Sequence, residues 1–191
     1  MDIDKVIKTL SNGGLVVMPT DTIYGICAKA SDQAAASKLY KIKNRSKKPG
    51  TLIAASIDQL VDLGIKRRYL KPIEHFWPGA VSVVIPTGFG LKYLDHGVGT
   101  LAMRVVADLT LTKILEQTGP LLTTSANLPD QPPANTIKEA KQYFGDKIDL
   151  YIDGGDLSGQ EPSTVIRVVD DAIEILREGA VKIDEQGRIK Q

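Results

Sequence analysis

Apolar patterns with the period of a helix alternate with short apolar runs along this chain of 191 residues. Apolar residues recur at helical spacing from residue 2 to 11, and Asn12-Gly13-Gly14 then supplies a C-terminal stop. The run 15–18, which Pro19 closes, is typical of a buried strand. A chain that changes between the two periods in this way favours an α/β fold.

The same patterns predict the other elements. Further helices are expected from Ser31 or Asp32 to the break at 45–50, over 57–63 and 66–76, from Asp108 to Glu116, and from the capping box of Thr136 and Glu139 onward. Further strands are expected at 51–55, 81–85, 101–106, 121–124, 150–152, 164–169 and 173–176. The last two strands are joined by Asp170-Asp171, which leaves no room for a helical crossover. We therefore predict one α/β domain of two or three layers, in which helices flank a single twisted sheet of mixed strands.

Composition agrees with one folded domain. Hydrophobic residues make up 42% and charged residues 25% of the chain, which disfavours a disordered chain, a collagen-like repeat and a coiled coil. A domain of this length buries enough surface to fold without a disulfide or a metal. We assign residues 1–183 to the domain and 184–191 to a polar C-terminal tail.

Cysteine and histidine usage argues against a structural metal. Cys27 is the only cysteine, so it has no disulfide partner in the chain, and we expect it to be a small buried residue. His75 and His96 are too few for most zinc or iron sites. The N-terminus lacks the pattern of a secretory signal, and no apolar run approaches the roughly 20 residues of a membrane span. We therefore expect a cytoplasmic protein with no membrane partner and no metal held by side chains.

A basic run stands out from the near-neutral balance of 24 basic and 23 acidic residues. Six of the eleven residues from Lys38 to Lys48 are basic and none is acidic. A second basic cluster follows at 66–71. Such runs suit a polyanionic ligand, either a nucleotide phosphate or a nucleic-acid backbone, although a solvated helix face would read the same way.

Familiar nucleotide and hydrolase motifs are absent. The sequence contains no GxxxxGK[ST] loop, and no GxGxxG follows the first predicted strand. It contains neither a GxSxG elbow nor an HExxH pair. A nucleotide, if bound, is therefore held in another way.

Hydroxyl-rich segments sit at the ends of predicted strands, at 20–22, 123–127 and 163–164. Short hydroxyl and amide side chains with neighbouring backbone N–H groups can hold phosphate or carboxylate oxygens, although each segment alone is more often a turn or a cap. Arg104 and Arg177 lie between apolar neighbours on predicted strands, where a charged side chain should face a cleft. Guanidinium groups hold phosphate or carboxylate in two-point contacts, so their convergence would make an anion site.

Seven motifs in register resemble the YrdC-like family of threonylcarbamoyl-AMP synthases. They are Pro19-Thr-Asp-Thr-Ile-Tyr-Gly25, Lys43-x-Arg45, Trp77-Pro-Gly79, Arg104, Ser125-Ala-Asn127, Ser163-Thr-Val165 and Leu176-Arg-Glu-Gly179. The resemblance spans residues 15–181 and is to the short, single-domain form of the family, which implies a concave basic cleft. It implies an enzyme that joins L-threonine, bicarbonate and ATP into threonylcarbamoyl-AMP and pyrophosphate, for the threonylcarbamoyladenosine modification of tRNA, together with downstream tRNA-modification proteins.

The resemblance also implies roles for individual residues. Catalytic contacts to the ATP phosphates would come from Lys43 and Arg45. Nucleotide contacts would come from Lys43, Arg45, Thr100, Ser125, Asn127 and Arg177, and threonine contacts from Thr20, Thr22, Arg104 and Ser163. Magnesium would arrive on ATP, since Mg²⁺ is usually held largely by phosphates and water.

Two other functions remain open at this point. The basic run also suits a protein that binds double-stranded RNA or tRNA directly. The second is the activity of a family member that has the same fold but acts on a different substrate, because Ser46 and the segment near Ala54 depart from the family pattern.

Overall fold

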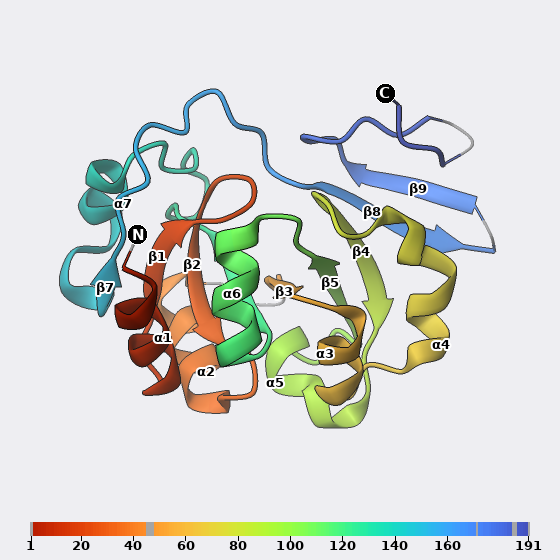
Figure 1. Cartoon of the computed structure of the whole chain (residues 1–191), viewed down its shortest axis with the longest axis horizontal. Coiled ribbons are helices and arrows are strands. Elements are labelled where there is room, and N and C mark those ends of the chain that lie inside the picture. Colours follow the sequence, from red (N-terminus) through yellow and green to blue (C-terminus); the bar gives the residue numbers. More distant parts are fainter. Residues whose placement is uncertain (1, 45–47, 171, 185–186, 191) are drawn as a thin grey trace.

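Nine strands form one mixed sheet in the computed structural model, which describes residues 2–44, 48–170, 172–184 and 187–190. The strands are β1 (Val16–Pro19), β2 (Tyr24–Lys29), β3 (Thr51–Ala54), β4 (Val81–Pro86), β5 (Thr100–Val105), β6 (Leu121–Ser125), β7 (Leu150–Tyr151), β8 (Thr164–Val169) and β9 (Ala172–Arg177). Their order is β7-β1-β2-β6-β3-β5-β4-β8-β9, which runs from left to right in Figure 1. Strands β1/β7, β3/β5 and β4/β8 pair in parallel and the other neighbours antiparallel, so the predicted mixed sheet is confirmed.

Short helices connect these strands. They are α1 (Ile3–Ser11), α2 (Gln33–Ile42), α3 (Ile57–Asp62), α4 (Arg67–Leu70), α5 (Lys92–Asp95), α6 (Leu109–Thr118) and α7 (Ile137–Phe144), with 3₁₀ turns η1 (Lys71–Phe76), η2 (Phe89–Leu91) and η3 (Gly145–Lys147). Asp32, Asp108 and Thr136 accept backbone N–H groups at the starts of α2, α6 and α7, which confirms the predicted caps. No helix within the described ranges is both long and apolar enough to cross a membrane.

The sheet has two differently covered faces. On one, which we call the α2 face, side chains such as Leu39, Phe76 and Leu94 pack in a large core with the inward residues of the strands. On the other, the α6 face, apolar residues of α1 and α6 pack in a smaller core that includes Cys27 and Leu121. This smaller core covers only part of its face, and a polar pocket occupies the remainder.

Three parts of the fold differ from the sequence expectations. Strand β2 was not predicted, because it is buried along nearly its whole length and shows no alternation. The helix expected at 66–76 ends as α4 at Leu70, and Pro72 lies in the 3₁₀ turn that follows. The short helix α5 was not predicted either. In the described part of the C-terminal tail, Ile189 is bridged to Ile183.

Tyr24 of β2 fastens the long segment that joins β7 to β8. Its side chain is fully buried, and its hydroxyl donates to the Gly155 carbonyl at 2.9 Å and accepts from the Gly154 N–H at 2.8 Å. Gly154 also lies so close to Pro19 that an added Cβ would fall 2.4 Å from the proline ring. The hydroxyl therefore anchors a backbone segment that continues to Pro162, and Pro162 lines the polar pocket described below.

Tyr24→Phe removes both of these hydrogen bonds and keeps the ring. We expect the free energy of unfolding in urea to fall by about 1 to 2 kcal/mol, the net value of one or two typical hydrogen bonds. Tyr69→Phe is the matched control, because its hydroxyl accepts a hydrogen bond from the exposed Arg68 side chain and from no other described residue. Equal stability of the two variants would show that the Tyr24 hydroxyl does not fasten this segment.

Candidate active site

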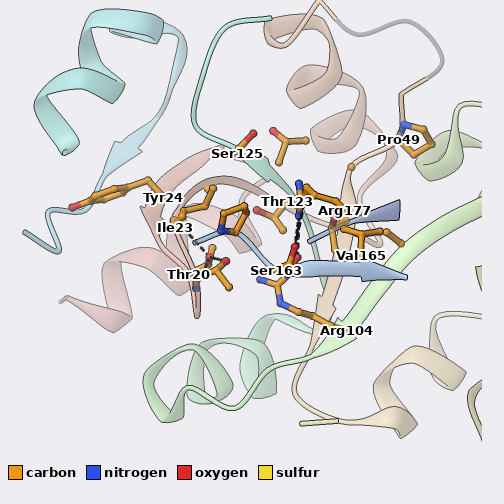
Figure 2. Close-up of a pocket in the computed structure, with 17 residues that line it drawn as sticks. Thr20, Ile23, Tyr24, Pro49, Arg104, Thr123, Ser125, Ser163, Val165 and Arg177 are labelled. Atoms are coloured by element: carbon orange, nitrogen blue, oxygen red, sulfur yellow. Dashed lines mark hydrogen bonds between the residues drawn. The ribbon is translucent and has the colours of Figure 1, made fainter. Parts of the chain in front are cut away.

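A polar pocket of about 240 Å³ occupies the open part of the α6 face (Figure 2). Its lining combines two arginines with hydroxyl side chains and close backbone. The lining residues are Thr20, Thr22, Ile23, Tyr24, Gly25, Pro49, Gly50, Thr51, Ala102, Arg104, Thr123, Thr124, Ser125, Pro162, Ser163, Val165 and Arg177.

Strand alternation places these residues together. Leu121 belongs to the smaller core, so Thr123 and Ser125, two and four residues on, point to the same face. On β5, Leu101, Met103 and Val105 belong to the larger core, which turns Ala102 and Arg104 toward the pocket. In each of these strands, the side chains on one side pack in the larger core, and polar or small side chains on the other side face the pocket.

A tight turn shapes the pocket edge between β1 and β2. The Thr20 hydroxyl donates to the Ile23 carbonyl at 2.8 Å and lies 3.2 Å from the Thr22 hydroxyl. The Thr22 N–H in turn donates to the Thr20 hydroxyl at 3.3 Å. These bonds hold Asp21, at the tip of the turn, against Arg104.

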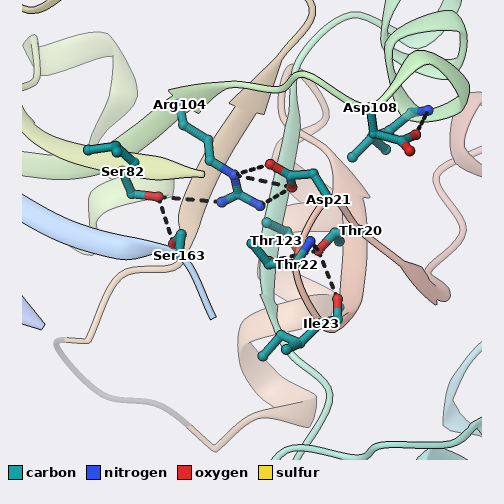
Figure 3. Close-up of polar contacts among 12 residues, drawn as sticks. Thr20, Asp21, Thr22, Ile23, Ser82, Arg104, Asp108, Thr123 and Ser163 are labelled. Atoms are coloured by element: carbon teal, nitrogen blue, oxygen red, sulfur yellow. Dashed lines mark hydrogen bonds and ion pairs between the residues drawn. The ribbon is translucent and has the colours of Figure 1, made fainter. Parts of the chain in front are cut away.

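Asp21 and Arg104 form a buried ion pair beside the pocket (Figure 3). Their side chains are 6% and 4% exposed. Arg104 Nε donates to Asp21 Oδ2 at 2.9 Å, Nη2 donates to Oδ1, and Nη1 donates to Ser82 Oγ at 3.4 Å. A guanidinium carries five N–H groups, so within the described part of the chain two remain for a ligand.

A chain of hydrogen bonds through two serine hydroxyls connects Arg104 to Arg177. Ser82 Oγ lies 3.0 Å from Ser163 Oγ. Arg177 Nη2 donates to Ser163 Oγ at 3.2 Å and to the Ser163 carbonyl at 2.7 Å. The two arginines are therefore connected through two buried serines, beside a pocket to which β5, β8 and β9 contribute.

Lys43 lies behind the pocket with its ammonium group directed at the end of β6. The residue is fully buried, and Nζ donates to the Ser125 carbonyl at 2.8 Å, to Asn127 Oδ1 at 2.9 Å and to the Asn127 carbonyl. Ser125 Oγ donates to Asn127 Oδ1 at 2.7 Å. Lys43 therefore fixes the Ser125–Asn127 segment, for which the family resemblance implies contacts to the nucleotide.

The structure brings most of the predicted site residues together. Six of them line the pocket: Thr20, Thr22, Arg104, Ser125, Ser163 and Arg177. Lys43 and Asn127 adjoin it through Ser125. Thr100 lies on the same side of β5 as Ala102 but outside the pocket lining. Arg45 lies outside the described residues.

Several residues of the site were not singled out from the sequence. Asp21 stood within a quoted motif, and the need of a buried arginine for a counter-ion is the signal that could have identified it. Gly25 and Gly50 are required by close approach, since an added Cβ would lie 2.6 Å from Thr123 Oγ1 or 2.7 Å from the Thr123 carbonyl. Pairing of β6 with β2 and β3 creates these contacts, and a linear sequence does not reveal it.

Cys27 lies beneath the pocket, as the sequence predicts, in a fully buried position. Burial raises the pKa of its thiol to about 11, although a hydrogen bond to the Thr123 hydroxyl acts in the opposite direction. The thiolate is the reactive form of cysteine, so this thiol is inert near neutral pH.

We expect Cys27 to resist alkylation by iodoacetamide at pH 8 in the folded protein and to react fully in denaturant. Because its pKa is raised, the folded state keeps the proton that the unfolded state loses, so unfolding should become easier as pH rises above 9. Mass spectrometry before and after denaturation measures the labelling. Rapid labelling of the native protein would contradict this account.

The described residues contain no group of three or more His, Cys, Asp or Glu side chains that could hold a metal ion. The carboxylate of Asp21, beside the pocket, is already paired with Arg104. The lining offers cations and hydroxyls, a donor set that fits anionic oxygens better than a bare metal.

Fold and site together define a class: an α/β protein in which one face of a mixed sheet carries an arginine- and hydroxyl-lined pocket. A family model named Sua5/YciO/YrdC, described as telomere recombination, matches residues 8–179. The chain belongs to the Sua5/YciO/YrdC family, which confirms the resemblance seen in its motifs.

Individual relatives agree with this assignment. A Mycobacterium leprae protein provisionally named as a threonylcarbamoyl-AMP synthase is 34% identical, over 93% of this chain and 82% of its own length. The crystal structure of Pyrococcus abyssi Sua5 complexed with L-threonine superimposes with a TM-score of 0.83 at 29% identity, over 94% of this chain and 54% of Sua5. E. coli YciO gives a TM-score of 0.78 at 27% identity, over 93% and 88%.

Proposed function

We propose that this protein is a threonylcarbamoyl-AMP synthase, a nucleotidyltransferase that converts L-threonine, bicarbonate and ATP into threonylcarbamoyl-AMP and pyrophosphate. The observation that carries the proposal is the convergence of Arg104, Arg177, Ser125 and Ser163 on one pocket. The names of the relatives, and the L-threonine complex of Pyrococcus abyssi Sua5, support the same reaction.

The reaction has two bond-forming steps. The threonine amine, in its neutral form, attacks the carbon of bicarbonate, and loss of water gives a carbamate. A carbamate oxygen then attacks the α-phosphorus of ATP, and the bond from that phosphorus to the β-phosphate oxygen breaks to release pyrophosphate. Negative charge accumulates on phosphate oxygens, where fixed cations stabilise it.

The pocket supplies positioning groups for these steps. We assign Thr20, Thr22, Arg104 and Ser163 to threonine, with the two uncommitted N–H groups of Arg104 available to its carboxylate. We assign Ser125, Asn127 and Arg177 to the nucleotide, with Arg45 toward the phosphates and Thr100 as an outer nucleotide contact. Lys43 is buried and its ammonium group holds Ser125 and Asn127, so we assign it to positioning this segment in place of the direct phosphate contact expected from the resemblance. Holding the carbamate oxygen in line with the leaving pyrophosphate supplies much of the rate, so no covalent nucleophile is needed.

Magnesium enters as part of the substrate in this proposal. Mg²⁺ binds readily to the phosphate oxygens of ATP and keeps several waters, so it needs few protein ligands. In this proposal the β- and γ-phosphates are neutralised by that ion and by Arg45, and the other pocket residues bind the rest of the substrates.

We place the enzyme in the cytoplasm, where its product would pass to further tRNA-modification proteins that attach it to tRNA. Direct binding of double-stranded RNA or tRNA is the alternative that the basic run raised. The described lysines of the run do not form one surface: Lys38 pairs with Asp149 at 2.7 Å and Lys43 is buried. This dispersion favours the synthase, and binding of duplex RNA that weakens steeply with salt would favour the alternative.

A changed substrate is the other alternative, raised by the departures at Ser46 and near Ala54. Ala54 is fully buried in the larger core, on the sheet face opposite the pocket, whereas Thr51 of the same strand lines the pocket. Ser46 lies outside the described residues. The threonine side of the pocket therefore retains the hydroxyls and the arginine that the proposed substrate requires.

Product analysis tests the proposal directly. The purified protein is incubated with Mg-ATP, L-threonine and ¹³C-bicarbonate, and the product is identified by mass spectrometry. We expect a species with the mass of threonylcarbamoyl-AMP that carries the ¹³C label. An adenylate without the label, or a labelled product when serine replaces threonine with equal efficiency, would overturn the assignment.

A further inference from the structure

A second cavity, of about 580 Å³, lies between α2 and α5. It is lined by Gln33, Ser37, Tyr40, Lys41, Asn44, Lys92, Tyr93 and His96. Both helices pack into the larger core on the α2 face, so this cavity and the pocket lie on opposite faces of the sheet. None of the residues that line the cavity lines the pocket.

His96 is the most unusual residue of this cavity. Its Nε2 is enclosed and has no hydrogen-bond partner among the described residues. Its backbone is left-handed, with φ of 54°, which is uncommon for a residue with a side chain. Its ring lies 3.8 Å from the ring of Tyr40. A nitrogen in this state gains most from a ligand that supplies a hydrogen-bond partner.

The charge of the lining is entirely positive. Lys41 and Lys92 line the cavity, and none of its eight lining residues is acidic. The nearest carboxylates are already engaged: Asp32 accepts the N–H groups of Ala34 and Ala35, and Asp95 accepts the Thr87 hydroxyl and the Gly97 N–H. Lys92 Nζ lies 3.9 Å from the centre of the Phe89 ring, which is uncharged, so the walls of the cavity supply no counter-charge to either lysine.

Hydrogen-bond donors complete the lining. Gln33 of α2 and Asn44, two residues beyond the end of α2, carry amide N–H groups, and Ser37 of α2 carries a hydroxyl. Two ammonium groups, an imidazole and several neutral donors match the oxygens of a tetrahedral anion. The hydroxyls of Tyr40 and Tyr93 are committed to the Leu94 and Ala30 carbonyls, so the tyrosines act as walls.

We propose that the α2–α5 cavity is a second ligand site, which binds a small anion of the phosphate class through Lys41, Lys92 and His96. Its size accommodates either free phosphate or a phosphate monoester. The site also gives a role to Lys41, one of the basic residues that the synthase reaction leaves unassigned. It is independent of the proposed function, because it shares no residue with the pocket.

Nuclear magnetic resonance of the histidine rings tests this site, since the chain has only two histidines. The full-length protein is titrated at constant pH with sodium phosphate and, separately, with glycerol 3-phosphate. We expect the His96 ring signal to shift and saturate at millimolar concentrations, while that of the exposed His75 stays in place. Stronger binding of glycerol 3-phosphate would identify a monoester as the ligand class, and stronger binding of inorganic phosphate would identify the free ion.

Charge-matched variants provide the control. Lys41→Gln/Lys92→Gln should weaken phosphate binding about tenfold, as loss of two ionic contacts predicts. Lys113→Gln/Lys147→Gln makes the same change in net charge at exposed positions elsewhere and should leave binding unaltered. Three results would each overturn the proposal: no saturable shift, the same shift with sodium chloride at matched ionic strength, or equal weakening by both double variants.

Discussion

Asp21→Ala is expected to lower the free energy of unfolding by about 3 to 5 kcal/mol, because it leaves the buried Arg104 guanidinium without its counter-ion. The side chains of the pair are only 6% and 4% exposed, so loss of the carboxylate leaves a largely desolvated charge. Urea unfolding followed by circular dichroism measures the change.

The double variant Asp21→Ala/Arg104→Met distinguishes the effect of an unpaired buried charge from a general loss of stability. Removing both charges should recover most of the lost stability, since an apolar pair of similar volume avoids the desolvation of an unpaired charge. Pyrophosphate release should be lost in the double variant nevertheless, because the proposed threonine contact is gone. Losses in stability that simply add would show that Asp21 and Arg104 are not coupled.

Arg177→Met is expected to lower the rate of pyrophosphate release by about 10² to 10³, the usual effect of removing one positioned donor to developing charge. Arg177 lines the pocket and holds the Ser163 backbone and hydroxyl. Steady-state kinetics with threonine and ATP varied in turn measure the effect.

Arg167→Met is the matched control for this variant. Arg167 lies on β8, is half exposed and pairs with Glu174 on β9, away from the pocket lining. We expect its activity to remain within about twofold of the unmodified protein, as for surface substitutions generally. Equal losses in both variants would indicate a general effect on β8 and β9 in place of a role for Arg177 in the site.

Much of the architecture is predictable from local signals. The caps Asp32, Asp108 and Thr136 mark helix starts by a mechanism that acts within four residues, and the structure confirms all three. Strand β2 shows where such local signals fail. Tyr24–Lys29 is buried on both sides, and a short apolar run with glycine and alanine has no periodicity that distinguishes a strand from a helix.

The site divides in the same way. Alternation along β5 is enough to direct Arg104 away from the larger core. The position of the Lys43 ammonium group cannot be predicted in this way, because the partners of a long, flexible side chain depend on the tertiary fold. Here they are the Ser125 and Asn127 carbonyls. The pairing of Asp21 with Arg104 across 83 residues is likewise set by the sheet order.

The central claim is that one pocket holds threonine and the reacting end of ATP together. Measurement of pyrophosphate release with each substrate omitted in turn tests it most directly. The account predicts that release requires L-threonine, bicarbonate and ATP at once, and that omission of any one abolishes it. Release that continues unchanged without threonine would contradict it.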